Sequence, residues 1–425
     1  MRGRGPFRAA LAAGFAAVGL VAAAADVAAP ASEGLKLERV VMVMRHGVRP
    51  PTKPNPTPEG TSAEPWSTWT TPFGDLTPHG AAGATLMGRY ARGDFARRGL
   101  LPADGCPANA VSVRASGKSR AIETAKSFVE GLAPRCAIKV DHPVREEDDV
   151  VFHPLGRGQK LDPAVARQAA LRQAPAGGLD AERRAHQAEF ATLQRVLRCC
   201  APSACPRGAA GCAIGDFESE LKADGEGKPA LEGALGMAST AAQTLLLEYV
   251  EGKPMAEVGW GRANKADIQA LLRFHATKFR YEVRSPYVAE RYAAPLARRV
   301  VDTLTAAGPA RLTLLVGHDT NLAALGGYLD LHWTPADYPP DSLPPGGALG
   351  FERLSGPTGK TYVRAFFIAQ TLDQLRNLTP LDAANAPVRV EVPIPGCGQR
   401  EPATPCEIAS FERLVRNKLA HPAGS

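Results

Sequence analysis

The stretch LERVVMVMR at positions 37–45 decides the fold, because it is an almost unbroken apolar and β-branched run bounded by polar residues. A run of this kind is typical of a strand that is buried on both faces of a sheet. It is followed at once by HGVRPP at positions 46–51. Since prolines end both helices and strand ladders, we expect the polar residues after the strand to lie in a loop at its C-terminal end.

Outward from this strand, the sequence alternates between helix and strand patterns. A cap residue followed by proline at Thr77-Pro78 predicts the start of a helix that runs to about Gly99. Residues 110–114 are predicted to form a strand, 118–132 a helix and 137–140 a third short strand. Further strands are predicted at 311–316, 349–354, 361–370 and 388–392. This order predicts an α/β fold, with a three-layer α/β/α core around a central, mostly parallel mixed sheet.

The middle of the chain follows a different pattern. Residues 147–289 contain helical segments and loops but no convincing strand, and the clearest helices are expected at 181–198 and 231–251. We therefore expect a smaller α-helical insertion domain over 147–289. It would divide the α/β core into two parts, 36–146 and 290–425.

The first residues have the layout of a secretory signal. Three arginines, at positions 2, 4 and 8, precede an apolar stretch over 9–25 and a run of small residues. The stretch is short and alanine-rich beside the roughly 20 strongly apolar residues of a spanning helix. We expect a signal peptide over 1–25 with cleavage between 25 and 32, no membrane anchor after cleavage, and a periplasmic or secreted protein.

The chain has eight cysteines, an even number, and in an exported protein these are expected to form disulfides. Three pairings are natural from their positions: Cys205 with Cys212, Cys397 with Cys406, and Cys106 with Cys136 around a strand-helix unit. The pairing of the adjacent Cys199 and Cys200 is left open. Because no CxxC pair or interleaved histidine spacing occurs, we expect neither a metal site nor a cofactor.

Composition and charge exclude two further classes of protein. A hydrophobic content of 44% with 22% charged residues is close to the globular average, which excludes disorder of the whole chain. The net charge of +7 is small for 425 residues, and no run of lysine or arginine occurs. Binding to nucleic acid is therefore not expected.

Polar clusters follow two of the predicted strands. Arg45, His46 and Arg49 come directly after the first strand, and His318 and Asp319 follow the strand at 311–316. In open α/β sheets, ligands bind at the carboxyl ends of strands, so the two clusters can converge on one site. Arginine offers paired donors that match phosphate oxygens, and a helix beginning after Asp319 would add backbone donors. The sequence therefore predicts a site for a strongly anionic ligand.

These motifs resemble those of the histidine acid phosphatases, a branch of the histidine phosphatase superfamily with the pattern RHGxRxP and a late HD. Here the two halves are RHGVRPP at 45–51 and HD at 318–319. LTPHG at 76–80, GWGR at 259–262, HDTNLAALGG at 318–327 and QTLDQLR at 370–376 extend the resemblance toward bacterial periplasmic phytases and acid phosphatases. It covers the chain from about Leu37 to Leu419.

The resemblance implies a role for each matching residue. His46 would attack phosphorus and become a transient phosphohistidine, and Asp319 would protonate the leaving alcohol. The residues implied in binding the phosphate group are Arg45, Arg49, His318 and a third arginine, for which Arg120 fits better than Arg114. Phosphoryl transfer mainly requires positioning and neutralisation of charge, which arginines supply without a metal.

The resemblance also bears on the substrate. Thr52 and Lys53 follow the motif directly, as in phytase pockets where the lysine helps to hold a polyphosphorylated substrate. Gln243, however, stands where similar phytases carry a glutamate. We expect hydrolysis of small phosphate monoesters, with phytate (inositol hexakisphosphate) as the substrate, by a monomer. The alternatives are a glucose-1-phosphatase-like or broad-range sugar phosphatase and, from another class, a non-catalytic phosphate-ligand binding protein.

The remaining histidines show no spacing to a chemical partner. We interpret them as ordinary surface or core residues: His79, His142, His153, His186, His275, His332 and His421.

Overall fold

The computed structural model describes residues 34–155, 160–206, 209, 211–397, 405–420 and 422, together with Met1 and Gly3. Apart from those two residues, the expected signal peptide lies outside the described part of the chain, and so does His421. Internal contacts group Gly34–Ser425 into one unit, separate from Met1–Glu33. Among the described residues, no helix has the length and apolar character that a membrane span requires.

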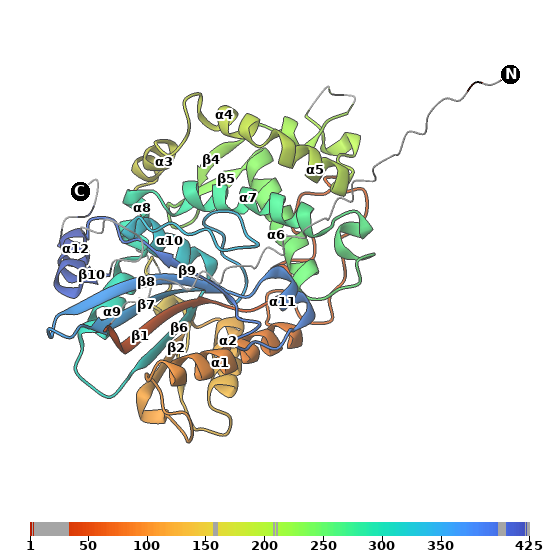
Figure 1. Ribbon diagram of the computed structural model, residues 1–425. Coiled ribbons are helices and arrows are strands. Elements are labelled where there is room, and N and C mark those ends of the chain that lie inside the picture. Colours follow the sequence, from red (N-terminus) through yellow and green to blue (C-terminus); the bar gives the residue numbers. More distant parts are fainter. Residues whose placement is uncertain are drawn as a thin grey trace. The chain divides into compact units, whose positions relative to one another are not determined.

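An eight-stranded mixed sheet forms the centre of this unit (Figure 1). Its strands follow the order β10-β8-β7-β1-β6-β2-β3, and β9 pairs with β8. The bounds are β1 Lys36–Arg45, β2 Val111–Ala115, β3 Val140–Asp141, β6 Leu312–Gly317, β7 Ala348–Ser355, β8 Thr361–Ala369, β9 Val388–Val392 and β10 Cys406–Glu407. The stretch that decides the fold is thus a central strand, hydrogen-bonded on both edges.

The sheet has a parallel half and an antiparallel half. β1, β6, β2 and β3 pair in parallel, whereas β1–β7, β7–β8, β8–β9 and β8–β10 are antiparallel. The link between β7 and β8 spans only residues 356–360, and so short a connection joins antiparallel neighbours. The expected α/β fold with a mixed sheet is confirmed, but the sheet is less parallel than expected.

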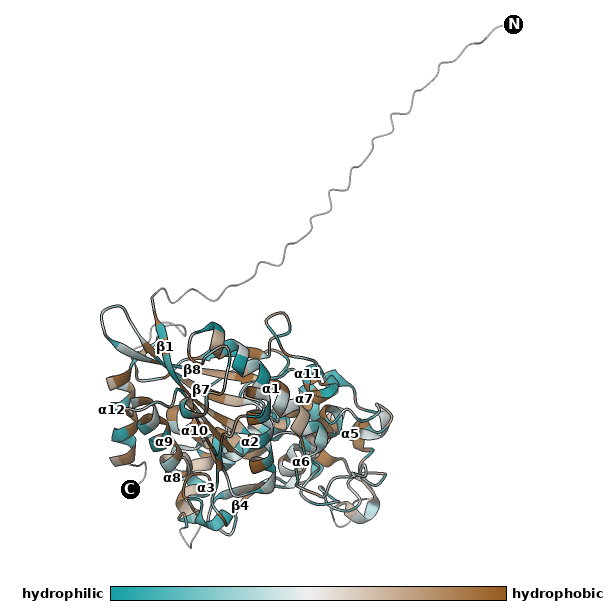
Figure 2. Ribbon diagram, turned by 90° about the horizontal axis from the view of Figure 1, so that it is seen from below, coloured by the Kyte–Doolittle hydropathy of each residue, from teal (hydrophilic) through white to brown (hydrophobic). Residues whose placement is uncertain are grey.

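Two helical layers cover the sheet, and β1 shows why its sequence is apolar throughout. Val40, Met42 and Met44 pack into the core formed with α1 (Pro78–Arg97) and α2 (Ser119–Leu132). Val41 and Val43 belong to the core on the opposite face, which includes residues of α9 (Ala294–Thr305), α10 (Asp319–Leu329) and α12 (Ile408–Ala420). Alternate side chains of a strand face opposite sides. The central strands β7 and β8 are accordingly coloured toward brown in Figure 2.

The middle of the chain is mainly helical. Its helices are α3 Pro163–Leu171, α4 Gly178–Ala185, α5 Gln187–Leu197, α6 Gly233–Val250, α7 Lys265–Glu282 and α8 Pro286–Tyr292. Outside this region, the short helix α11 (Leu372–Asn377) lies between β8 and β9. The helix predicted at 181–198 is interrupted at His186, where the backbone is not helical and α4 ends before α5 begins.

One expectation for this region is wrong, because it does contain strands. β4 (Glu220–Ala223) and β5 (Pro229–Glu232) form a two-stranded antiparallel sheet of their own. The turn between them is closed by Asp224, whose Oδ1 accepts hydrogen bonds from the backbone N–H groups of Glu226 and Lys228. Strands of four residues are too short for an alternating pattern to stand out, whereas a turn acid of this kind was a usable signal.

Four disulfides are present. The three expected pairings are confirmed: Cys106–Cys136, Cys205–Cys212 and Cys397–Cys406. The two adjacent cysteines that were left open, Cys199 and Cys200, are bonded to each other.

Candidate active site

The ends of β1 and β6 bring the two predicted polar clusters together. The strands run parallel in a register that places Arg45 beside Gly317. The backbone N–H of His46 donates to the oxygen of Gly317 over 2.9 Å, and α10 begins at Asp319. The loop after β1 and the start of α10 therefore meet at the carboxyl edge of the sheet, as the sequence predicted.

Arg45 is fully buried at this edge and held from two sides. Its Nη1 donates to the carbonyl oxygen of Leu343, and its Nη2 lies 2.9 Å from Oδ2 of Asp319. Burial, and then the neighbouring charge of Arg45, lower the pKa of Arg49 to about 10. The charge of Arg45 lowers the pKa of both Arg49 and Arg120, and cations so close together create a strongly positive field, which an anion would relieve.

His46 is 1% exposed, and its surroundings define which ring nitrogen is free. Nδ1 lies 2.9 Å from the carbonyl oxygen of Gly47. Because a carbonyl can only accept, Nδ1 carries the proton and Nε2 keeps its lone pair. Burial, and then the charges of Arg49 and Arg45, lower the pKa of His46 well below its ordinary value. The ring is therefore neutral at acid pH, with one nitrogen able to act as a nucleophile.

The backbone after β1 fits closely against α1 and α2. The N–H of Gly47 donates to Oγ1 of Thr124 over 2.9 Å. A Cβ atom on Gly80 would lie 2.3 Å from the oxygen of Val48, so only glycine permits this approach of α1. The loop that carries His46 is thus fixed by backbone contacts on both sides.

His318 is a second neutral histidine beside His46, with ring centroids 5.5 Å apart. Its Nδ1 is 3.4 Å from Nη2 of Arg120, and its Nε2 is 2.9 Å from Oγ of Ser116. Since the guanidinium can only donate, Nδ1 accepts and Nε2 carries the proton. Burial, followed by the charge of Arg120, lowers the pKa of His318 to about 3.

Arg120 and Arg114, the two candidates for the third arginine of the site, have different partners in the structure. Arg120, at the start of α2, reaches His318. Arg114, on β2, instead pairs with Asp141 at 2.9 Å and with Asp149 at 3.5 Å. Arg120 is therefore the third arginine of the cluster, and Arg114 is engaged elsewhere in ion pairs.

Asp319 is the first residue of α10 and accepts a hydrogen bond on Oδ1 from the N–H of Thr320. Burial alone would raise the pKa of this carboxyl, but the charge of Arg45 and then the neighbouring imidazole of His275 hold it well below its ordinary value. The carboxyl is therefore ionised when the site holds no other anion.

One residue of this cluster was missed, and its interpretation as an ordinary histidine is wrong. His275, on α7, has its Nε2 3.7 Å from Oδ2 of Asp319, and its Nδ1 is 3.1 Å from Oγ of Ser239 on α6. The sequence signal was the polar spacing of His275, Lys278 and Glu282 along one face of a helix.

A cavity of about 260 Å³ opens in front of this cluster. Its walls include the predicted Arg49, Thr52, Lys53 and Asp319, together with Gln243 of α6 and His275, Lys278 and Glu282 of α7. Both polar atoms of the Gln243 amide are buried and lack a hydrogen-bond partner within the described residues. Over that same part of the chain, no group of three or more histidine, cysteine or carboxylate side chains could hold a metal ion.

Comparisons with known proteins agree on one family. Residues 36–188 match the family described as "Histidine phosphatase superfamily (branch 2)". The phytase AppA of Escherichia coli (strain K12) is 35% identical over 411 residues, covering 92% of this chain and 94% of the relative. The glucose-1-phosphatase of Salmonella typhimurium is 28% identical, with coverage of 86% and 88%.

A solved structure gives the same result. The Hafnia alvei phytase in complex with myo-inositol hexakis sulphate superposes with a TM-score of 0.82 at 33% identity, covering 91% of this chain and 98% of that one.

Proposed function

Because the chain belongs to branch 2 of the histidine phosphatase superfamily and is a histidine acid phosphatase, we propose that it hydrolyses phytate and related phosphate monoesters through a phosphohistidine on His46. The observation that carries the chemistry is the neutral His46 with Nε2 free, beside a carboxyl and three arginines. No metal or cofactor enters the proposed reaction.

In the first step, the lone pair on Nε2 of His46 forms a bond to phosphorus and the bond to the ester oxygen breaks. Arg45, Arg49 and Arg120 neutralise the charge on the three remaining phosphate oxygens. The leaving oxygen takes a proton from Asp319 as it departs, so that an alcohol and not an alkoxide is released.

The proton on Asp319 must arrive with the substrate, because the pKa of this carboxyl is held low by Arg45 in the empty site. A bound phosphate adds negative charge beside the carboxyl and competes for Arg45. Both effects raise the pKa of Asp319. At acid pH the phosphate monoester also carries a proton that can pass to the carboxyl on binding.

In the second step, Asp319 accepts a proton from a water molecule whose oxygen attacks phosphorus. The bond between phosphorus and Nε2 breaks, which restores the neutral imidazole and releases inorganic phosphate. His275 is proposed to orient Asp319 during both steps, since its Nε2 is buried and faces the carboxyl.

The proposed preference for phytate rests on the cavity wall. Lys53, Lys278 and Arg49 line the cavity, so phosphate groups that are not being cleaved would also meet cations. The E. coli and H. alvei relatives are named as phytases. Gln243 adds an uncharged amide with no partner of its own among the described residues, which a phosphate or hydroxyl of the substrate could engage.

A glucose-1-phosphatase-like activity is the second candidate, and Gln243 is the observation that favours it. A neutral amide contacts a sugar hydroxyl as readily as a phosphate, and the Salmonella relative is named as a glucose-1-phosphatase. A non-catalytic phosphate-binding role is less favoured, because His46 and Asp319 are both in place.

The proposal also covers the location, oligomeric state and domain organisation of the enzyme. We propose export to the periplasm or medium after removal of residues 1–25, which agrees with four disulfides. We also propose a monomer in which residues 147–289 form an inserted domain that supplies the substrate-facing wall through α6 and α7.

Steady-state phosphate release at pH 5 tests the proposal with phytate, glucose 1-phosphate and an aryl phosphate, each with and without EDTA. Phytate should have the highest kcat/KM of the natural esters, and EDTA should leave all rates unchanged. A far higher kcat/KM for glucose 1-phosphate would show that the enzyme is a sugar phosphatase and not a phytase. A requirement for added metal would overturn the mechanism.

A further inference from the structure

Lys278 and Glu282 lie one turn apart on α7, and both line the active-site cavity. Nζ of Lys278 is 3.7 Å from Oε2 of Glu282. In the described part of the chain, Lys278 has no other ion-pair partner. The pair therefore lies in the wall that faces the substrate, although the proposed reaction gives Glu282 no role.

The position of this ion pair on the helix makes it a weak one. A lysine four residues before a glutamate is the less favourable order of the two charges along a helix. Glu282 is also the last residue of α7, where the negative end of the helix dipole destabilises a carboxylate. Its side chain is only 17% exposed. All three features favour the neutral carboxyl over the ionised one.

The contacts of the Glu282 carboxyl determine which oxygen a proton binds. Oε1 accepts a hydrogen bond of 2.8 Å from the backbone N–H of Leu231 on β5. Oε2 is the oxygen that faces Lys278. Because the N–H hydrogen already occupies Oε1, a proton binds to Oε2. Protonation thus removes the negative charge at the very atom that attracts the Lys278 ammonium.

The charges around Glu282 give the same direction. Burial raises the pKa of this carboxyl above its ordinary value. The charge of Lys278, the hydrogen bond from Leu231 and, less strongly, the charge of Lys228 oppose the effect of burial. Lys228 is itself paired with Glu226. Glu282 therefore stays protonated to a higher pH than an ordinary glutamate, and it pairs with Lys278 only above that range.

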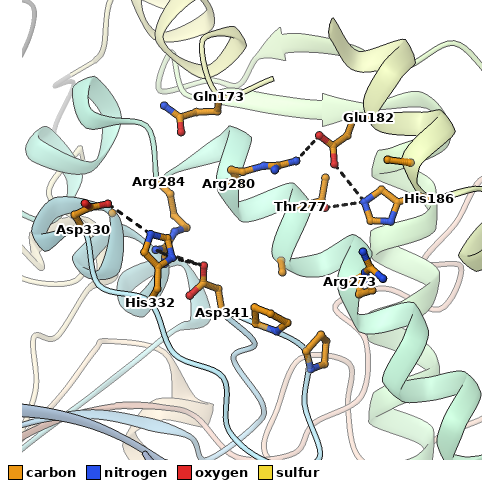
Figure 3. Close-up of a pocket in the computed structure, with 15 residues that line it drawn as sticks. Gln173, Glu182, His186, Arg273, Thr277, Arg280, Arg284, Asp330, His332 and Asp341 are labelled. Carbon is orange, nitrogen blue, oxygen red and sulfur yellow. Dashed lines mark hydrogen bonds and ion pairs between the residues drawn. The ribbon is translucent and has the colours of Figure 1, made fainter. Parts of the chain in front are cut away.

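The opposite face of α7 carries an ion pair that behaves differently. That face lines a cavity of about 670 Å³, in which Arg280 pairs with Glu182 (Figure 3). Burial would raise the pKa of Glu182, but its contact with His186 and then the charge of Arg280 lower it to about 2. Arg280 therefore keeps its carboxylate partner in acid, whereas Lys278 loses the charge that it pairs with.

We propose that protonation of Glu282 raises the affinity of the active-site cavity for substrates with more than one phosphate group, because it releases Lys278 to bind a phosphate that is not being cleaved. This role of Glu282 rests on the proposed function, since it takes the cavity to bind a phosphate ester. An ester with a single phosphate would gain much less, because its phosphate is held by the arginines at the strand ends.

Titration calorimetry of the full chain with myo-inositol hexakis sulphate, between pH 4 and pH 7, tests the proposal. The sulphate groups stay ionised throughout this range, so the charge of the ligand does not change. Glu282→Gln keeps an oxygen for the Leu231 N–H but cannot ionise. The variant should bind like the wild type at pH 4 and about fourfold more tightly than the wild type at pH 7, the scale of a partly exposed ion pair. The ratio of the two Kd values isolates Glu282, because the other charged or titratable residues that line the cavity are unchanged: Arg49, Lys53, His275 and Asp319.

A second pair of variants separates release of the lysine from simple loss of a negative charge. Lys278→Met removes the ammonium but keeps an apolar stem, and it should weaken binding of the hexasulphate about tenfold at pH 4. In that background, Glu282→Gln should change the Kd at pH 7 by less than about twofold, because no lysine is left to release. Glu412→Gln, at the pair that Glu412 forms with Arg416 four residues away on α12, is the control and should bind like the wild type at both pH values.

Two results would overturn the role of Glu282. One is a ratio of wild-type to Glu282→Gln Kd values that is the same at pH 4 and at pH 7. The other is an equal effect of Glu282→Gln with and without Lys278, which would show that the carboxylate only repels the ligand. Turnover of an aryl phosphate by the wild type reports separately on the proposed reaction. If turnover is present but both binding effects are absent, the phosphatase stands and the role of Glu282 falls; if both binding effects are present without turnover, the role of Glu282 stands and the reaction falls.

Discussion

The strand ends and the helical wall contribute to the same active-site cavity, but they hold their side chains differently. Arg45 and His46 are 0% and 1% exposed, and each is fixed by a backbone carbonyl. Lys53 is exposed, and the Gln243 amide has no partner within the described residues. The residues proposed for the chemistry are thus held at the ends of buried strands, whereas those proposed to choose the substrate are less constrained. A change of substrate in this fold needs no change in the chemistry.

If the strand ends carry the chemistry, His46→Ala should have the largest effect on turnover. Loss of a nucleophile typically costs on the order of a million-fold in kcat, and we expect a fall of that scale on every ester. The protein should remain folded, because the one hydrogen bond of the ring within the described residues is a local one, to the carbonyl of the next residue. Rates on an aryl phosphate and on phytate, with a circular-dichroism melt, check this. A loss confined to phytate would move His46 from the chemistry to substrate recognition.

Asp319→Asn should have the next largest effect, and that effect should depend on the leaving group. A general acid contributes roughly 10²- to 10⁴-fold, and only esters with poor leaving groups need it in full. Alkyl phosphates should therefore lose far more activity than aryl phosphates. Asp330→Asn, at the opposite end of α10, is the matched control. Equal losses on both classes of ester would exclude Asp319 as the proton donor.

The same contrast explains what could be predicted from the sequence. His46 and Asp319 each follow an apolar strand directly, so local pattern and a parallel register were enough to bring them together. His275 comes from a helix that precedes Asp319 by more than 40 positions, and only the packing of α7 places it there. The β4–β5 hairpin was missed because its strands are four residues long.

If the helical wall and the loop beside it choose the substrate, variants there should change KM more than kcat. Lys53→Ala should raise the KM for phytate about tenfold, the scale of one charge-assisted hydrogen bond, and that for glucose 1-phosphate much less. Gln243→Glu, which introduces a carboxylate, should alter the ratio of the two kcat/KM values while leaving the aryl phosphate kcat unchanged. Lys139→Ala, at another exposed lysine, is the control. Equal shifts for both esters would remove Lys53 from substrate selection.

The smallest expected effect separates the stability of the helical part from the chemistry of the strand ends. Glu248 of α6 is 2% exposed and accepts a hydrogen bond from the N–H of Gly259 on Oε2. Burial raises the pKa of this carboxyl from 4.5 to about 7. The folded protein therefore holds a proton that the unfolded chain releases near 4.5. Between these values the native state binds more protons, so the free energy of unfolding falls as pH rises.

Glu248→Gln should remove that fall: the two proteins should melt at similar temperatures near pH 4.5, and the variant should melt at the higher temperature near pH 7. The kcat on an aryl phosphate should be the same for both, because Glu248 does not line the active-site cavity. Melting curves that stay parallel across this range would show that Glu248 titrates alike in the folded and unfolded chains.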